Sequence, residues 1–175
     1  VFEAGEDLQV VGRYGIGVDT VDVEAATEAG VQVVNVASYC EQEVSTHALA
    51  LLLSVVRRTA AFDREIREGK WDWMEAIPLQ RLVGKTVGFA GFGKIAQNLL
   101  EKMQGFDVHF VVYDPYLSPE EVAEFGAEKL SFDEFVDAVD IVSVHTPLTE
   151  ETEGLFDASV FERIDDSAVL INTSR

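Results

Sequence analysis

The sequence predicts an α/β fold with a doubly wound parallel sheet. Apolar runs typical of buried strands alternate with helical patterns along the 175 residues, and such alternation implies parallel strands joined by right-handed crossovers. One apolar run leads directly into a glycine-rich turn, Gly91-Phe92-Gly93, which opens a helical stretch. Asp114 stands 23 positions after Gly91 (114 − 91), at the end of the next apolar run. This order of strand, glycines, helix, strand and acid is typical of a nucleotide-binding sheet.

The first part of the chain has the pattern of one strand–helix–strand unit. Residues 8–14 predict a strand, residues 22–30 a short helix that stops at Gly30, and residues 31–37 a second strand. One long helix is expected from Glu41 to about Glu68. Its apolar residues recur at helical spacing, namely Val44, Ala48, Leu51, Leu52, Val55 and Val56. Residues 67–85 then have the composition of a loop.

A second series begins at Thr86. Residues 86–93 predict a strand that runs into the glycines, residues 94–106 a helix and residues 107–114 a strand. The pairs Ser118 with Glu121 and Ser131 with Glu134 have the spacing of capping boxes, which predicts helices over 118–126 and 131–139. Strands over 140–147 and 168–175 close the series.

Charge and cysteine content exclude several classes of partner. The net charge of −19, from 32 acidic and 13 basic residues, repels nucleic-acid phosphates and anionic lipids. The apolar run 48–56 is too short to span a bilayer. Cys40 is the only cysteine, so no internal disulfide or cysteine-based zinc site can form, and no metal site is predicted. We therefore expect a cytoplasmic, halophilic protein with neither a nucleic-acid nor a membrane partner.

The glycine turn predicts a dinucleotide site. Gly91 would make the tight turn, Gly93 would let a pyrophosphate approach the backbone, and the helix opening at Lys94 and Ile95 would direct its N-terminus at the phosphates. A carboxylate at Asp114 would accept hydrogen bonds from ribose hydroxyls and repel a 2′-phosphate, which favours NAD over NADP. The alternative is that the glycines form an ordinary turn and that the aspartate caps a turn before a proline.

Six segments together resemble one family. They are "VVGRYGIGVDTVDVEAATEAGVQVVNV", "HALALLLSVVRR", "GKTVGFAGFGKIA", "YDPY", "VHTPLTEET" and "LINTSR", and they resemble the D-isomer-specific 2-hydroxyacid dehydrogenases. "SYCEQEVSTHALALLL" and "WDW" are most similar to the branch that includes the C-terminal-binding-protein corepressors, with D-3-phosphoglycerate dehydrogenase and glyoxylate or hydroxypyruvate reductase nearby. The resemblance implies a remnant of a flavodoxin-like substrate domain over residues 1–37 and an NAD-binding Rossmann domain over 38–175, truncated at its C-terminal end.

The same resemblance implies the roles of individual residues. The backbone of Gly15, Ile16 and Gly17 would grip the substrate carboxylate, although an ordinary glycine turn is the alternative. Arg175 would be the catalytic arginine that holds the substrate carboxylate and carbonyl oxygen with its bidentate fork. The family's glutamate and acid/base histidine would follow beyond Arg175, so we expect the 175 residues by themselves to be inactive.

The residues implied to contact NAD form a larger set. Beyond Gly91, Gly93, Lys94, Ile95 and Asp114, the resemblance implies cofactor contacts at His145, Thr146, Pro147, Thr152, Thr173, Ser174 and Arg175. His145 has a second interpretation, as a core histidine with satisfied hydrogen bonds.

The implied activity is hydride transfer between NAD(H) and a D-2-hydroxyacid or 2-oxoacid, such as phosphoglycerate, glyoxylate or hydroxypyruvate, in a homodimer. The alternatives are a non-catalytic, NAD-sensing interaction module of the corepressor type and a Rossmann domain of another reductase. Trp71 and Trp73 are expected to pack in the loop between the domains or to reach a partner subunit.

Overall fold

A computed structural model describes residues 2–5, 7–72, 74 and 79–174. The chain divides into two compact units, residues 1–41 and 42–175. Trp73 and Arg175, for which roles are predicted above, lie outside the described residues. No helix in the described ranges combines the length and the apolar character that crossing a membrane requires.

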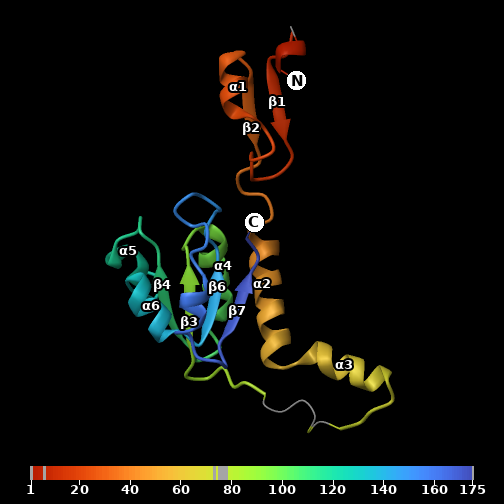
Figure 1. Ribbon diagram of the computed structural model, residues 1–175, viewed down its shortest axis with the longest axis vertical. Coiled ribbons are helices and arrows are strands. Elements are labelled where there is room, and N and C mark those ends of the chain that lie inside the picture. The colour runs from red at the N-terminus through yellow and green to blue at the C-terminus, as the bar shows by residue number, and fades with distance from the viewer. Residues whose placement is uncertain (1, 6, 73, 75–78, 175) are drawn as a thin grey trace. The chain divides into compact units, whose positions relative to one another are not determined.

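The first unit is a strand–helix–strand unit, as the sequence predicts (Figure 1). A 3-10 helix, η1 (Phe2–Ala4), precedes β1 (Val10–Arg13), α1 (Val23–Glu28) and β2 (Gln32–Asn35). The two strands pair in parallel, with Val10 opposite Gln32. Asp22 caps α1 because its side chain accepts a hydrogen bond of 2.9 Å from Ala25 N.

The second unit contains a parallel sheet of five strands in the order β5-β4-β3-β6-β7. The strands are β3 (Thr86–Ala90), β4 (His109–Tyr113), β5 (Glu128–Lys129), β6 (Ile141–Val144) and β7 (Val169–Asn172). The chain proceeds outward from β3 in one direction and then returns to continue outward from β6 in the other. The predicted doubly wound topology is therefore confirmed, and its reversal lies between β3 and β6, where ligands bind in open sheets of this kind.

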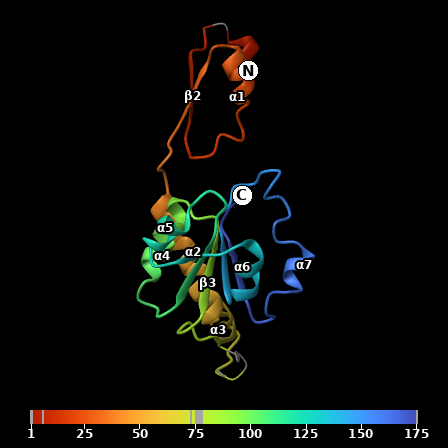
Figure 2. The same ribbon diagram turned by 90° about the vertical axis from the view of Figure 1, so that its left-hand side faces the viewer.

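Helices cover both faces of this sheet (Figure 2). One face packs against α2 (Glu41–Val56), α4 (Lys94–Met103) and α5 (Pro119–Ala123), and the other against α6 (Phe132–Ala138) and α7 (Ala158–Phe161). Phe89, Phe92 and Leu99 are almost fully buried on the first face, and Phe135 is buried on the second. Each such side chain stabilises the fold by about 1.5–3 kcal/mol, so both layers hold the strand ends in fixed positions.

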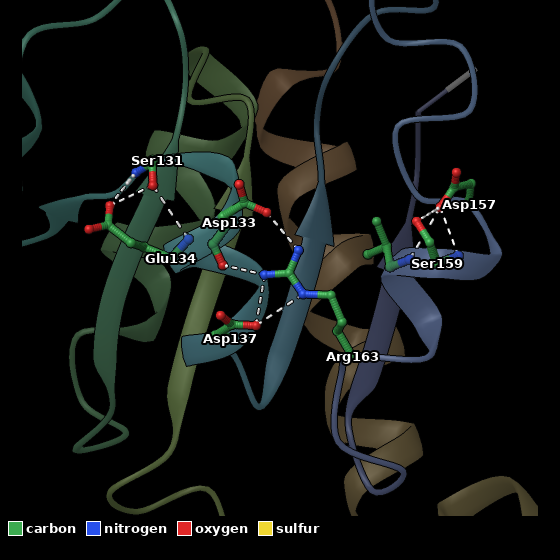
Figure 3. Close-up of polar contacts among 8 residues, drawn as sticks. Ser131, Asp133, Glu134, Asp137, Asp157, Ser159 and Arg163 are labelled. Carbon is green, nitrogen blue, oxygen red and sulfur yellow. Dashed lines mark hydrogen bonds and ion pairs between the residues drawn. The ribbon is translucent and has the colours of Figure 1, made fainter.

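Polar contacts fasten the α6 and α7 layer (Figure 3). Arg163 donates hydrogen bonds to Asp133 Oδ1 at 2.6 Å and Asp137 Oδ1 at 2.9 Å, which joins the segment after α7 to α6. The predicted capping boxes at Ser118 and Ser131 are both present. These caps satisfy backbone N–H groups that a helix start otherwise leaves without partners.

The structure corrects the prediction of one helix from Glu41 to about Glu68. The helix α2 ends at Val56, and a separate helix, α3 (Thr59–Arg67), follows after Arg58, whose φ of +52° is left-handed. Phe62 and Ile66 continue the apolar spacing of α2 across this break, so periodicity alone gives no sign of it. No residue of α3 is buried, and Figure 1 shows it pointing away from the sheet.

Candidate cofactor-binding site

The glycine turn after β3 is held against the ends of the two neighbouring strands. Gly91 N donates a hydrogen bond of 2.8 Å to Tyr113 O at the end of β4. Gly91 has a φ of +82°, and a Cβ atom there would lie 3.0 Å from both His145 C and Thr146 N, just beyond β6. Only glycine meets both demands, because other residues are strained at this φ and the neighbouring atoms are backbone.

The start of α4 is open. Gly93 is its N-cap residue without a side-chain cap, and a Cβ atom at Gly93 would meet nothing within 4 Å. Lys94 is exposed and Ile95 is partly exposed. The first N–H groups of a helix have no partner within the helix, and the helix dipole adds positive potential there. This end of α4 is therefore suited to receive an anion, as the sequence predicts for a pyrophosphate.

Asp114 lies beside the same turn. Its Oδ2 accepts a hydrogen bond of 2.9 Å from Phe92 N, and its Oδ1 accepts one of 2.9 Å from Tyr116 N. The second bond closes a turn through Pro115, and such a turn is the alternative role that the sequence offers for Asp114. An ionised carboxylate has about four acceptor positions, so two positions stay open for hydroxyl donors.

His145 is the first residue after β6 and packs into the sheet. Its Nε2 lies 2.8 Å from Ser143 Oγ, and its ring centroid lies 6.2 Å from that of Phe89. Burial lowers the pKa of His145 to about 4, so the imidazole is neutral at pH 7. The bond to Ser143 realises the interpretation of a histidine with a satisfied hydrogen bond. The backbone of His145 also lies against Gly91 of the glycine turn, and its contact with the cofactor stays a prediction.

A cavity of about 270 Å³ lies beyond the ends of β6 and β7, and Thr146, Pro147, Thr152 and Ser174 are among its lining residues. The hydroxyl of Thr152 donates to Pro147 O, and Ser174 Oγ donates to Val144 O at 3.1 Å. The first bond closes the loop after β6, and the second joins the segment after β7 to the end of β6. Thr173 is half-buried and is not one of the lining residues.

The predicted substrate loop belongs to the first unit, whereas all of the described cofactor residues belong to the second. Gly15 has a φ of +145°, and its carbonyl oxygen accepts a hydrogen bond of 3.1 Å from Val36 N. Asn35 Nδ2 donates to Ile16 O at 2.7 Å. These bonds fix the loop through Gly17 to the end of β2. Arg13 donates to Tyr14 O at 2.6 Å, and its buried Nε has no hydrogen-bond partner among the described residues.

A comparison with protein families identifies this arrangement. Residues 49–175 match the family model described as "D-isomer specific 2-hydroxyacid dehydrogenase, NAD binding domain". The chain belongs to the D-isomer-specific 2-hydroxyacid dehydrogenase family. The family predicted from the sequence, its Rossmann fold and its cofactor NAD are thereby confirmed.

Several curated relatives match the whole chain. The D-3-phosphoglycerate dehydrogenase of Mycobacterium tuberculosis is 39% identical over 175 residues, and that of Archaeoglobus fulgidus is 33% identical. Each match covers 100% of this chain and 33% of the relative, so the chain spans about a third of their length. The glyoxylate reductase of Korarchaeum cryptofilum is 34% identical, and 54% of it is covered.

Solved structures of the same fold include enzymes with different substrates. The NAD-dependent formate dehydrogenase of Staphylococcus aureus, in complex with NAD, aligns with a TM-score of 0.87 and 34% identity. That alignment covers 99% of this chain and 52% of the enzyme. The D-lactate dehydrogenase of Escherichia coli aligns with a TM-score of 0.84 and 29% identity, covering 95% of this chain and 52% of the enzyme.

Three structural observations indicate that the residues of this chain fit NAD. Gly91 and Gly93 leave backbone exposed at the start of α4, Asp114 keeps acceptor positions beside the turn, and a cavity continues beyond β6 and β7. Sequence reasoning missed one residue of this region, Ser143. Residues two positions apart in a strand lie on the same face, so the sequence could have indicated that Ser143 lies beside His145.

Proposed function

We propose that this chain is the cofactor-binding part of an oxidoreductase that transfers hydride between NAD(H) and a D-2-hydroxyacid or 2-oxoacid. Residues 1–37 belong to its substrate domain and residues 38–175 to its NAD-binding domain. The single observation that supports this function best is the glycine turn, which packs against β6 and has Asp114 hydrogen-bonded to Phe92 N. The relatives named above carry the names of enzymes, which favours a dehydrogenase over a non-catalytic corepressor-like module.

The chain's own residues bind and orient the reactants. Gly91, Gly93 and the first N–H groups of α4, at Lys94 and Ile95, hold the pyrophosphate. Asp114 accepts hydrogen bonds from the ribose hydroxyls and repels a 2′-phosphate, so NAD is preferred over NADP.

The nicotinamide half lies near the ends of β6 and β7. The residues that contact it are His145, Thr146, Pro147, Thr152, Thr173, Ser174 and Arg175. When bound, the cofactor accepts or supplies the hydride.

The substrate is a small 2-oxoacid or 2-hydroxyacid of the phosphoglycerate, glyoxylate or hydroxypyruvate type. The backbone at Gly15, Ile16 and Gly17 holds its carboxylate. Arg175 holds the carboxylate and polarises the carbonyl oxygen, because a guanidinium is permanently charged and offers two parallel donors. An arginine cannot exchange a proton at neutral pH, so the acid/base group is a different residue of the full-length protein.

The functional protein is a homodimer, and the arm formed by residues 55–74 supports this proposal. Several of its apolar side chains are exposed, including Trp71 at 90%, Met74 at 62% and Ile66 at 55%. An apolar helix face that no described residue covers indicates a surface to which another molecule binds.

Charge indicates that the partner of the arm is a second copy of this chain. Residues 55–74 contain five basic and four acidic residues, whereas the rest of the chain contains eight basic and 28 acidic residues. Arg57, Arg58 and Arg64 form no ion pair with any described residue. A cationic, apolar arm is complementary to the acidic body of a second copy.

The net charge of −19 supports a cytoplasmic location in a halophile. Acidic side chains on the surface keep a protein soluble, while their mutual repulsion destabilises the fold unless salt screens it. The same charge disfavours nucleic-acid and membrane partners.

The activity is tested in the full-length protein that contains this chain. NADH absorbance is followed with glyoxylate, hydroxypyruvate and pyruvate as substrates, and turnover of at least one is expected. Arg175→Ala and Arg175→Lys are expected to lose most of the rate, because lysine cannot form the bidentate contact. NAD binding without turnover of any 2-oxoacid would instead favour the non-catalytic module.

A further inference from the structure

The last residues of four neighbouring strands form one row at the carboxyl end of the five-stranded sheet. The strand pairing places them in the order Tyr113, Ala90, Val144 and Asn172. The first three are followed directly by residues of the proposed cofactor site, namely Asp114, Gly91 and His145. Asn172 occupies the fourth place in this row, and the segment after it leads to Arg175.

Backbone hydrogen bonds hold two of the exits from this row. Gly91 N donates to Tyr113 O, and His145 N donates to Ala90 O, each at 2.8 Å. Each bond continues the ladder between two parallel strands by one residue. The backbone therefore fixes the points at which the chain leaves β3 and β6.

Side chains hold the exit from β7. Asn172 Oδ1 accepts a hydrogen bond of 2.9 Å from Ser174 N, which is the turn that an asparagine side chain commonly forms with the backbone two residues later. Ser174 Oγ donates to Val144 O at 3.1 Å, and this bond joins the turn to the neighbouring residue of the row. The backbone N–H and the hydroxyl of Ser174 are thus both engaged.

This turn lies at the proposed nicotinamide end of the site. Asn172, Ser174 and Val144 all line the cavity of about 270 Å³ beyond β6 and β7. The backbone of His145, which follows Val144, is the one that a Cβ atom at Gly91 would contact. The segment that leaves β7 is therefore connected to the glycine turn through the end of β6.

We propose that Asn172 is a positioning residue that, by holding Ser174, directs Arg175 toward the substrate. This inference rests on the proposed function, in which the guanidinium of Arg175 holds the substrate carboxylate. A bidentate contact requires the right distance and the right orientation at once, and a displacement of about 1 Å can lower a rate by up to about 100-fold. The alternative is that the turn at Asn172 only ends β7.

Removal of the Asn172 acceptor should affect the substrate more than the cofactor. In Asn172→Ala, Ser174 keeps its bond to Val144 O but loses the partner of its N–H, so we expect kcat/KM for the 2-oxoacid to fall about tenfold. The dissociation constant of NADH should change less than about twofold, because the groups that would hold the pyrophosphate and the ribose are unaltered. Asn172→Ser keeps a weaker acceptor and should lose about threefold in kcat/KM.

The test uses the full-length protein, with turnover of glyoxylate, hydroxypyruvate and pyruvate followed by NADH absorbance and NADH binding measured by calorimetry. The discriminating measurement repeats Asn172→Ala in an Arg175→Ala background, at a higher enzyme concentration. Without a guanidinium to direct, the second substitution should change the remaining kcat/KM less than about twofold. Asp165→Ala is the matched control, because Asp165 Oδ1 accepts a hydrogen bond of 2.7 Å from Ser167 N and forms the same kind of turn before β7. This control should lower the stability in urea and leave kcat/KM unchanged.

Four results overturn the positioning role while leaving the proposed function intact. They are an unchanged kcat/KM in Asn172→Ala, an NADH affinity that falls in proportion to kcat/KM, a loss in the Arg175→Ala background as large as in the wild type, and an equal loss of kcat/KM in Asp165→Ala. If the alanine variant does not fold, Asn172→Ser carries the same comparisons. A full rate in Arg175→Ala overturns the role of Arg175 and this inference with it, and a wild-type protein that turns over no 2-oxoacid overturns both proposals.

Discussion

Replacement of Gly91 by alanine tests whether the glycine turn is built by close packing against β6 rather than by backbone conformation alone. The φ of +82° makes any L side chain strained, at a cost of about 1–2 kcal/mol. The added Cβ would also lie 3.0 Å from His145 C and Thr146 N. These are backbone atoms held by the sheet, so relief requires moving the end of β6, which adds about 1–3 kcal/mol of overpacking. We expect a total loss of about 2–5 kcal/mol.

Gly84 offers a matched control for the backbone contribution. Its φ is +79°, nearly that of Gly91, but a Cβ atom there would meet nothing within 4 Å. Gly84→Ala therefore retains the strain and lacks the contact, and its loss is expected to stay at about 1–2 kcal/mol. Gly93→Ala has neither the backbone strain nor the close contact, so it is expected to fold normally. It is expected to bind NADH more weakly, because the added methyl group lies where the pyrophosphate approaches the backbone.

The assay is urea denaturation followed by circular dichroism, with NADH binding measured on the same proteins by calorimetry. Gly91→Ala is expected to lose both stability and NADH affinity, and Gly84→Ala to lose stability alone. Equal losses of stability for the two variants would show that the contact with β6 costs nothing. Unchanged NADH affinity in Gly91→Ala would refute the role of the turn in holding the cofactor.

Three further predictions concern other parts of the molecule. Asp114→Ala should narrow the preference for NAD over NADP in calorimetry, because it removes the charge that repels a 2′-phosphate, and tighter NADP binding by the wild-type protein would contradict this. Ile66→Asp should shift the protein from dimer to monomer in light scattering, whereas Val83→Asp, which alters a residue of similar exposure (48% against 55%) outside the arm, should leave the dimer intact. Molar KCl should raise the melting temperature because it screens a net charge of −19, and a constant melting temperature would argue against salt adaptation.

The features that the sequence predicts well are those that neighbouring residues determine. Both capping boxes were predictable because Ser131 and Glu134, like Ser118 and Glu121, satisfy each other's backbone within one helical turn. The strands β3, β4 and β6 were predictable because each is a mainly apolar run whose central residues are buried on both faces. The glycine turn belongs to the same class, since its left-handed φ demands glycine at Gly91.

The features that the sequence does not predict depend on contacts between distant residues. The break at Arg58 lies inside an unchanged apolar period, so only the absence of any buried residue in α3 distinguishes it from a continuation of α2. The short helix α7 has four residues and one cap, too little for a recognisable period. The burial that lowers the pKa of His145 involves a neighbouring strand, through Phe89 of β3. The residues next to His145 in the sequence do not indicate this burial.

The two ends of the cofactor site therefore respond to mutation in different ways. At the pyrophosphate end of the proposed site the binding groups would be backbone N–H groups, and Gly91 and Gly93 would act by having no side chain. At the proposed nicotinamide end the groups would include side chains held by packing, and His145 lies between Phe89 and Ser143. Substitutions at the first end should change affinity equally for oxidised and reduced cofactor, since both carry the same pyrophosphate. Substitutions at the nicotinamide end should separate the two forms, because only the nicotinamide ring differs in charge between them.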